Sequence, residues 1–185
     1  MSFRYEIRLS GAGGQGLILI GKILAEAAAI YDDKNATQSQ SYGPEARGGA
    51  SRSEVIISDS DIDYPKATNI DLLLAMTQEA VDKYATEVKN GGIIITDSSF
   101  VMHQPKGKFK VYSFPITEIA EKKVGRKIVA NIIALGAIER LSQVVSPEAV
   151  INAIRARVPK GTEQTNITAF KYGQELVDDK TPVTR

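Results

Sequence analysis

A cluster of glycines between a strand-like and a helix-like segment constrains the fold of this chain more than any other feature. Residues 3–10 alternate apolar and polar side chains, which predicts a strand with one buried face. The segment from Gln15 to about Ile30 is apolar around most of a helical circumference, which predicts a helix packed on a sheet. Between them stands Gly11-Ala-Gly-Gly-Gln-Gly16, which fits the GxGxxG pattern in the strand-to-helix context that the pattern requires. We therefore expect a strand, a glycine loop and a helix that open an α/β fold.

The rest of the chain continues this alternation of strands and helices. Strands are predicted over residues 36–42, 51–57, 71–76, 93–97 and 110–114, and helices over residues 78–89, 116–124, 129–141 and 165–176. A turn is predicted at residues 90–92, and Ser146 is predicted to cap a further helix whose first residue is Pro147. The fold class is α/β, with a Rossmann-like, mostly parallel sheet flanked by helices and a helical C-terminal third. Because 185 residues with no repeat or linker suit one core, we expect a single domain over residues 1–185.

The residue types that are absent limit the chemistry of the chain. It has no Cys, no Trp and one His, His103. Without thiolates it can form no disulfide, no Cys-ligated iron–sulfur cluster or zinc site and no cysteine nucleophile, and one imidazole excludes a multi-histidine metal site. We therefore expect no metal site and no catalytic side chain here, so that any redox or covalent chemistry comes from a bound cofactor or a partner chain.

Charge and hydropathy argue against two further classes of protein. The 23 Lys and Arg against 22 Asp and Glu give a formal net charge of +1, which is less basic than is usual for nucleic-acid-binding proteins. The N-terminal segment lacks the layout of a signal peptide, and no apolar run approaches the roughly 20 residues that cross a bilayer. We expect a soluble cytoplasmic protein with neither a nucleic acid nor a membrane as partner.

The glycine loop is the first candidate binding site. Its candidate residues are Gly11, Gly13, Gly14, Gln15 and Gly16. Glycines permit the unusual dihedrals of the turn and the close approach of a phosphate, and the N–H groups at the helix start favour an anion. NAD sites add an Asp or Glu about 20 residues further on, and residues 36–42 contain no acid. The missing acid makes NAD a less favoured ligand without excluding it. The loop could instead bind a pyrophosphate or carboxylate group of another ligand, or it could be a strand-to-helix turn that binds nothing.

A second candidate is the segment of residues 42–52, which contains three glycines, a proline and two arginines. Glycines beside an arginine let the guanidinium and backbone amides converge on one planar anion. The candidate residues are Arg47, Gly48 and Gly49. The alternative is a surface loop in which Arg47 and Arg52 pair with nearby carboxylates.

Other polar positions have open roles. Asp97-Ser98-Ser99 follows a predicted parallel strand, where α/β sheets bind ligands, and could equally be a cap or turn cluster. We expect His103 to be a surface loop residue. Asn131, within an apolar helix, must find a buried partner, and Gly136 in the same helix is expected to allow close packing.

Several of these segments occur together in a recognisable order: residues 11–16, 42–51, 62–65, 71–75, 91–98, 131–136 and 166–173. The ordered set resembles the gamma subunit of 2-oxoacid:ferredoxin oxidoreductases over nearly the whole chain. The family's enzymes convert a 2-oxoacid, CoA and oxidised ferredoxin to an acyl-CoA, carbon dioxide and reduced ferredoxin. The resemblance most favours 2-oxoglutarate (2-ketoglutarate) as the oxoacid, with pyruvate and branched-chain 2-oxoacids next.

The resemblance also implies a division of labour among subunits. Thiamine diphosphate and its catalytic groups belong to the alpha and beta subunits, and iron–sulfur clusters belong to the beta and ferredoxin-like delta subunits. The gamma chain then contributes CoA binding and scaffolding, has no tightly bound cofactor, is inactive alone and meets ferredoxin only through the complex. The loop of residues 11–16 would bind the CoA phosphates, and Arg47 and Arg52 would supplement it or line the contact with the thiamine-bearing subunits.

Three points stay open at this stage. The chain could be an autonomous NAD(P)- or other nucleotide-binding oxidoreductase or sensor. It could also be a purely structural subunit whose glycine loop binds nothing. A homodimer of the isolated chain is compatible with either role.

Overall fold

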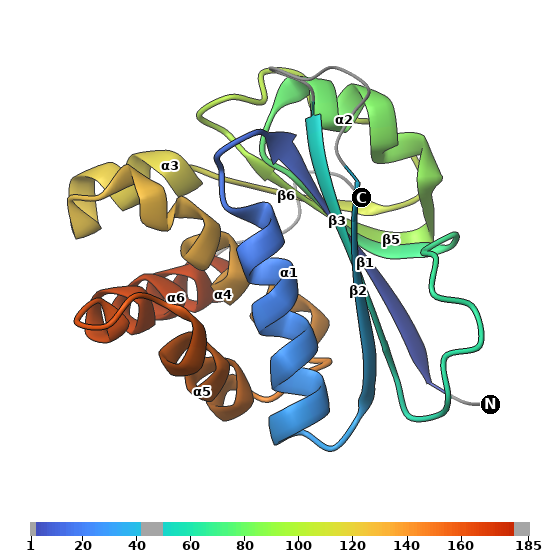
Figure 1. Cartoon of the computed structure of the whole chain (residues 1–185). Helices are drawn as coiled ribbons and strands as arrows, with labels where there is room; N and C mark the ends of the chain where they lie inside the picture. The colour runs from blue at the N-terminus through green and yellow to red at the C-terminus, as the bar shows by residue number, and fades with distance from the viewer. Residues whose placement is uncertain (1–2, 42–49, 180–185) are drawn as a thin grey trace.

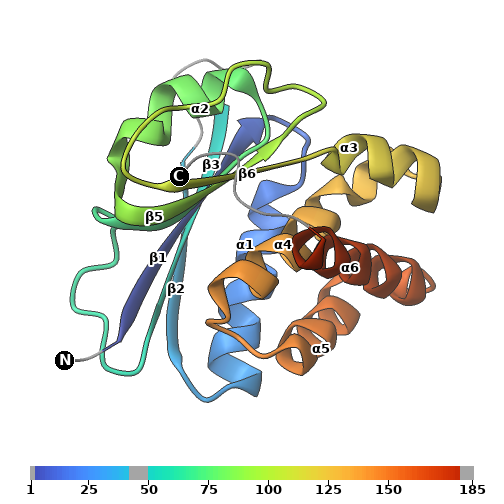
Figure 2. The same cartoon turned by 180° about the vertical axis from the view of Figure 1, so that it is seen from behind.

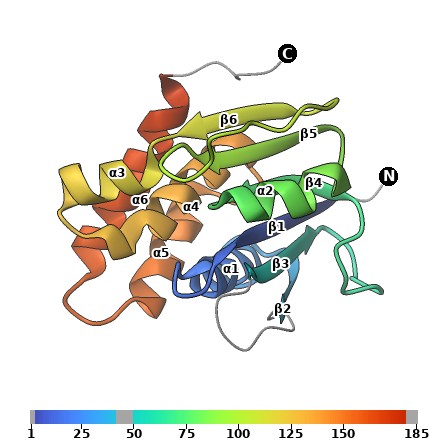
Figure 3. The ribbon, with the colours of Figure 1, turned by 90° about the horizontal axis from the view of Figure 1, so that it is seen from above.

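The computed structural model describes residues 3–41 and 50–179, which form a six-stranded sheet with helices on both faces (Figures 1 and 2). Its strands are β1 (Arg4–Ala12), β2 (Asn35–Ser41), β3 (Ala50–Ser58), β4 (Ile70–Ala75), β5 (Val88–Asp97) and β6 (Lys110–Phe114). Their order across the sheet is β2-β3-β1-β4-β5-β6 (Figure 3). Strands β1, β4, β5 and β6 are parallel neighbours, whereas β3 is antiparallel to both β1 and β2. The predicted strands and the mostly parallel sheet are confirmed.

The helices lie in two layers of unequal size. They are α1 (Leu17–Glu26), α2 (Gln78–Tyr84), α3 (Ile116–Ile119), α4 (Ala130–Ser142), α5 (Pro147–Arg157) and α6 (Glu163–Asp178). Helix α2 covers one face of the sheet, and α1 with α3–α6 covers the other (Figures 1 and 2). As predicted, the C-terminal third is helical, and the hydroxyl of Ser146 accepts a hydrogen bond from the N–H of Ala149 at 3.2 Å. None of the helices within the described ranges combines the length and the apolar character needed to span a membrane.

Strand β4 shows why the sheet needs both layers. All six of its residues are buried, as is usual for a parallel strand covered on both faces. Leu72 and Leu74 belong to the larger core under α1 and α4, while Leu73 belongs to the smaller core under α2. The apolar run in this part of the sequence is therefore continuous because its alternate side chains pack into two separate cores.

Two predicted boundaries between residues 78 and 92 were wrong. The helix predicted over residues 78–89 ends at Tyr84 and continues only as a 3₁₀ turn over Ala85–Glu87, because Val88 already pairs with Ile70 in the sheet. The turn predicted at residues 90–92 lies inside β5, where the register with β4 shifts. Gly91 takes a φ of 80° there, and its N–H donates to the carbonyl of Lys108 at 2.6 Å. The glycines thus permit an irregularity in the pairing of β5 rather than a turn between two elements.

Strand β3 distinguishes this sheet from a dinucleotide-binding Rossmann sheet. In that fold the strand after the first helix lies next to β1, whereas here β3 lies between β1 and β2. Helix α1 therefore packs over β3, so closely that a Cβ on Gly21 would lie 2.4 Å from the hydroxyl oxygen of Ser53. The carboxyl end of β2 is displaced from that of β1 by two strand spacings, or about 10 Å.

Helices α4 and α6 cross at a pair of glycines. A Cβ on Gly136 would lie 2.0 Å from the carbonyl oxygen of Phe170, and one on Gly173 would lie 1.9 Å from that of Ile133. Any side chain at either position would therefore force the two backbones apart. The close packing expected of Gly136 is confirmed, and its partner is Gly173.

A buried acid lies beside this crossing and makes stability depend on pH. Glu139 of α4 is 3% exposed, and its carboxylate accepts a hydrogen bond from the side-chain amide of Gln174 at 2.6 Å. Burial raises the pKa of Glu139, against the opposing effect of that hydrogen bond. Because the folded state favours the protonated acid, stability present below the ordinary carboxyl pKa is lost as pH rises through the raised pKa.

We therefore expect Glu139→Gln to raise the Tm at about pH 7.5 and to have no such effect near pH 4, where the wild-type acid is protonated. Calorimetric Tm measurements across this pH range test the prediction. The exposed Glu175 of α6 provides the control, because Glu175→Gln removes the same charge without a burial effect. A gain for Glu139→Gln that is equal at both ends of the pH range would contradict it.

Candidate functional site

The carboxyl ends of β1 and β4 form the topological switch point of the sheet. These neighbouring parallel strands lead into helices on opposite faces, β1 into α1 and β4 into α2 (Figures 1 and 3). Open α/β sheets bind ligands in the crevice that such a divergence leaves. The glycine loop, residues 11–16, lies at this point, and the N–H of Met76 at the end of β4 donates to the carbonyl of Ser10 at 2.9 Å.

The loop is closed by one of its own side chains. The amide oxygen of Gln15 accepts a hydrogen bond from the N–H of Ala12 at 2.8 Å. A Cβ on Gly11 would lie 2.2 Å from that same oxygen and 2.9 Å from the Cβ of Met76. Gly11 is therefore required by packing, and Gln15 has a structural role that the glycine pattern alone did not indicate.

Two further glycines are required by backbone conformation. Gly14 has a φ of 84° and Gly16 a φ of 72°, both in the left-handed region that favours glycine. Gly16 is also the N-cap residue of α1, and a Cβ on it would lie 2.3 Å from the side-chain nitrogen of Asn131.

Gly13 differs from its neighbours because the fold does not explain it. It is exposed, its φ is not positive, and no atom among the described residues lies within 4 Å of a Cβ built on it. Among those residues none accepts a hydrogen bond from the N–H of Gly13 or Gly14. The first turn of α1 carries no acidic residue, so the positive end of the helix dipole is unopposed there. The loop thus presents free N–H groups and a positive dipole end to an approaching anion.

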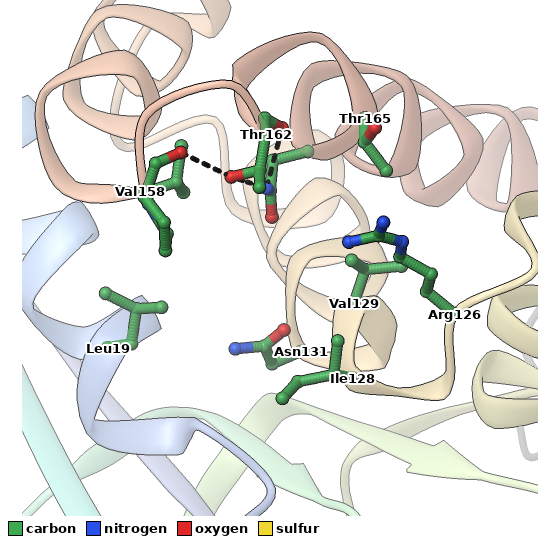
Figure 4. A pocket seen from close by; sticks show the side chains of 10 residues that line it. Leu19, Arg126, Ile128, Val129, Asn131, Val158, Thr162 and Thr165 are labelled. Carbon is green, nitrogen blue, oxygen red and sulfur yellow. Dashed lines mark hydrogen bonds between the residues drawn. The ribbon is translucent and has the colours of Figure 1, made fainter.

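A pocket of about 270 Å³ lies between α1, the start of α4 and the connection from α5 to α6 (Figure 4). Apolar side chains from three parts of the chain line it, among them Leu19, Val129 and Val158, together with the polar Asn131 and Thr162. The amide of Asn131 points from α4 toward α1 in Figure 4. Its nitrogen donates to the carbonyl of Gly16 at 3.1 Å, so the buried partner expected for Asn131 is the glycine loop. No sequence pattern indicated the pocket, since its walls come from distant segments.

Of the second candidate segment, residues 42–52, the structure describes only residues 50–52. Arg47, Gly48 and Gly49 lie outside the described residues. Arg52 lies on the α2 face of the sheet, with its guanidinium nitrogen 3.6 Å from a carboxylate oxygen of Glu54 and its guanidinium carbon 5.8 Å from the centre of the Tyr84 ring. Arg52 therefore pairs with a nearby carboxylate, which is the second of the two roles considered for the arginines of this segment.

Asp97 is a structural residue rather than a free acid. Its side chain is fully buried and accepts hydrogen bonds from the N–H of Ser99 at 3.0 Å, the N–H of Thr117 at 3.1 Å and the hydroxyl of Thr117 at 2.5 Å. These bonds tie the end of β5 to the start of α3. Of the two roles left open for residues 97–99, the turn and cap role is the one that the contacts support.

His103 lies on the surface, as expected, in a turn held by Gln78. The side-chain oxygen of Gln78 accepts from the N–H groups of Met102 at 3.0 Å and His103 at 2.9 Å. Within residues 3–41 and 50–179, no group of three or more His, Cys, Asp or Glu side chains is arranged to hold a metal ion.

Comparison with known proteins extends these observations. The sequence model of the family described as pyruvate ferredoxin/flavodoxin oxidoreductase matches residues 6–176. The chain is 50% identical over 181 residues to 2-oxoglutarate synthase subunit KorC of Methanocaldococcus jannaschii, covering 97% of each chain. It superposes with a TM-score of 0.90 and 53% identity on the crystal structure of the keto/oxoacid ferredoxin oxidoreductase gamma subunit from Geobacter sulfurreducens, covering 97% of this chain and 99% of that one.

A more distant structure shares the fold alone. It is 2-oxoglutarate:ferredoxin oxidoreductase from Magnetococcus marinus with 2-oxoglutarate, coenzyme A and succinyl-CoA bound, at a TM-score of 0.85 and 22% identity. The match covers 98% of this chain and 32% of that chain, so the fold also occurs as one part of a longer polypeptide.

Together these matches define an α/β protein of the ferredoxin-linked oxoacid oxidoreductases. The chain belongs to the pyruvate ferredoxin/flavodoxin oxidoreductase family, in which its sequence and its fold are most similar to free-standing gamma subunits among the proteins compared above.

Proposed function

We propose that this chain is the gamma subunit of a 2-oxoglutarate:ferredoxin oxidoreductase and that its glycine loop binds the phosphate groups of CoA. The identity of 50% over almost the full length of a 2-oxoglutarate synthase subunit supports the enzyme and the oxoacid. Gly13 carries the proposal for CoA, because it is an exposed glycine with open space around it and free N–H groups beside it that the fold does not require.

The chemistry of the loop suits a phosphate-bearing co-substrate. CoA carries several negative charges on its phosphate groups, and a helix N-terminus with free N–H groups binds such charges. This chain would hold CoA so that its thiol reaches the acyl group on a partner subunit, where succinyl-CoA forms. Its own side chains would make or break no covalent bond.

The remaining cofactors fit better on partner chains. Thiamine diphosphate would lie on the alpha and beta subunits, and iron–sulfur clusters on the beta and delta subunits. The absence of Cys from all 185 residues supports the second assignment, because thiolates are the usual ligands of such clusters. Electrons would then reach ferredoxin through the complex and never pass through this chain.

We propose that Arg47, Gly48 and Gly49 complete the CoA site. The register of the sheet supports this, because Ala50, the first residue of β3, pairs with Ala12 of the glycine loop, and Ser51 pairs with Gly11. An arginine close to this position would add a bidentate phosphate contact that backbone amides cannot supply.

An autonomous NAD-binding role is less well supported. It needs an acid at the end of the strand after the first helix, beside the loop. That strand, β2, ends at Ser41 without an acid and is separated from β1 by β3. The ribose-binding arrangement of a Rossmann site therefore has no counterpart among these described strands.

Calorimetric titration and reconstitution test the proposal together. We expect the isolated chain to bind CoA in preference to NAD, NADP, FAD and ATP and to have no oxidoreductase activity. Added to its partner subunits, it should restore CoA-dependent ferredoxin reduction with 2-oxoglutarate, with pyruvate and branched-chain 2-oxoacids as poorer substrates. Full CoA-dependent turnover by the partner subunits alone would overturn the proposal, and tight NAD binding without CoA binding would favour the autonomous role.

A further inference from the structure

Asn131 is a buried polar residue whose side-chain amide connects α4 to the glycine loop. It lies in the first turn of α4, a helix in which ten consecutive residues are buried. Asn131 itself is 4% exposed. Its side-chain nitrogen donates to the carbonyl of Gly16 at 3.1 Å, and its side-chain oxygen accepts from the N–H of Ile132 at 2.9 Å. Among the described residues the side-chain nitrogen of Asn131 donates only to the carbonyl of Gly16, so this amide joins α4 to the glycine loop.

The contact acts at the residue that joins the loop to α1. Gly16 has a left-handed conformation, and its carbonyl also accepts the hydrogen bond from Ile20 at 3.3 Å that begins the helix. Because a peptide unit is planar and trans, the C=O of Gly16 and the N–H that follows it point in opposite directions. Holding the carbonyl toward α4 therefore fixes the direction of the first N–H group of α1 and the path of the preceding loop.

Helix α4, which carries Asn131, is itself held in place by close packing against α6. The pair Gly136 and Gly173 brings the backbones of α4 and α6 together without intervening side chains. Gln15 restrains the other side of the loop through its hydrogen bond from Ala12. Gly13 and Gly14 thus lie between two anchored points, one within the loop and one on α4.

We propose that Asn131 is a positioning residue for the CoA site: its hydrogen bond to Gly16 holds the glycine loop in the conformation that presents the N–H groups of Gly13 and Gly14 to phosphate. This inference rests on the proposed function, because it assigns Asn131 a role in the same site. It assigns no contact between Asn131 and the reacting atoms.

The test compares two buried asparagines of the same pocket. Asn166 is 8% exposed and also lines the pocket, but its side-chain nitrogen donates to the carbonyl of Thr162 at 2.9 Å and does not reach the loop. Asn131→Asp and Asn166→Asp each remove an amide donor with little change in shape. Asn131→Leu removes the donor without introducing a charge, which keeps the test valid if the aspartate variant fails to fold.

We expect Asn131→Asp and Asn131→Leu to raise the Kd of the isolated chain for CoA, and the KM for CoA of the reconstituted complex, by about 10-fold, as for the loss of one buried hydrogen bond. The KM for 2-oxoglutarate and the kcat at saturating CoA should stay unchanged, and Asn166→Asp should keep the wild-type affinity for CoA. A merely structural role would lower the Tm and leave the KM for CoA unchanged.

The outcomes separate the inference from the function on which it rests. If the wild-type chain does not bind CoA, the proposed CoA site fails, and the role of Asn131 fails with it. If the wild type binds CoA and the Asn131 variants bind it equally well, the positioning role alone is overturned. An equal loss of affinity in the Asn131 and Asn166 variants would also overturn it, since the effect would then belong to the pocket as a whole.

Discussion

Replacing Gly13 with aspartate is expected to abolish most CoA binding without unfolding the chain. A Cβ at this position meets no described atom within 4 Å, and the φ of Gly13 is not positive, so we expect the fold to accommodate an exposed side chain there. A carboxylate about 5 Å from a phosphate costs about 3 kcal/mol at the effective dielectric constant of a protein surface. We therefore expect the Kd for CoA to rise roughly 100-fold while the Tm stays near that of the wild type.

Two variants at the same position separate charge from bulk. Gly13→Lys places a longer side chain of opposite charge there and should retain CoA binding better than Gly13→Asp. Gly13→Ala should have a small effect on stability and should weaken CoA binding less than Gly13→Asp does. If Gly13→Asp binds CoA as the wild type does and supports full turnover in the complex, the loop is a structural turn and the chain is a purely structural subunit.

The second large effect is expected at the crossing of α4 and α6. Gly173→Ala places a methyl group 1.9 Å from the carbonyl oxygen of Ile133, a backbone atom that cannot rotate away. Helix propensity alone would favour Ala by about 1 kcal/mol, but overpacking costs about 1–3 kcal/mol and sometimes more. Because the opposing atom is backbone, we expect a cost at the top of this range and a net loss of about 2 kcal/mol, seen as a fall in Tm of roughly 6 °C for a chain of this size.

Gly13→Ala is the matched control for this stability measurement, because it adds the same methyl group where no described atom opposes it. Gly173→Ala should also weaken CoA binding, since a shift of α4 moves Asn131 away from Gly16. An unchanged Tm for Gly173→Ala would mean that the two helices do not approach as closely as described here.

The strands were predictable because their sequence signals are local. The buried run of β4 and the alternation in β1 follow directly from the side chains, and both strands lie where they were expected. The position of β3 was not predictable in the same way. Its insertion between β1 and β2 depends on pairing between residues about 50 positions apart, such as Arg4 with Ser58, and no local pattern encodes that choice.

The same limit applies to the candidate site. The glycine pattern indicated the loop, and the buried amide of Asn131 indicated that a partner must exist. That the two are partners depends on a contact 115 residues apart in sequence. The early end of α2 has a similar cause, because the pairing of Val88 with Ile70 in the sheet outweighs the helical preference of residues 85–89.

The two hydrogen bonds that hold the glycine loop, one from Ala12 to Gln15 and one from Asn131 to Gly16, are made between groups of this chain alone. If they form on folding, the conformational entropy of the loop is lost at that step, and little of it would remain to be lost on binding CoA at the proposed site. A loop ordered in advance lets association proceed at a rate set by diffusion and orientation, without a slow rearrangement. In a cycle that binds CoA and releases an acyl-CoA at every turnover, a preorganised loop would let both steps occur without refolding the site.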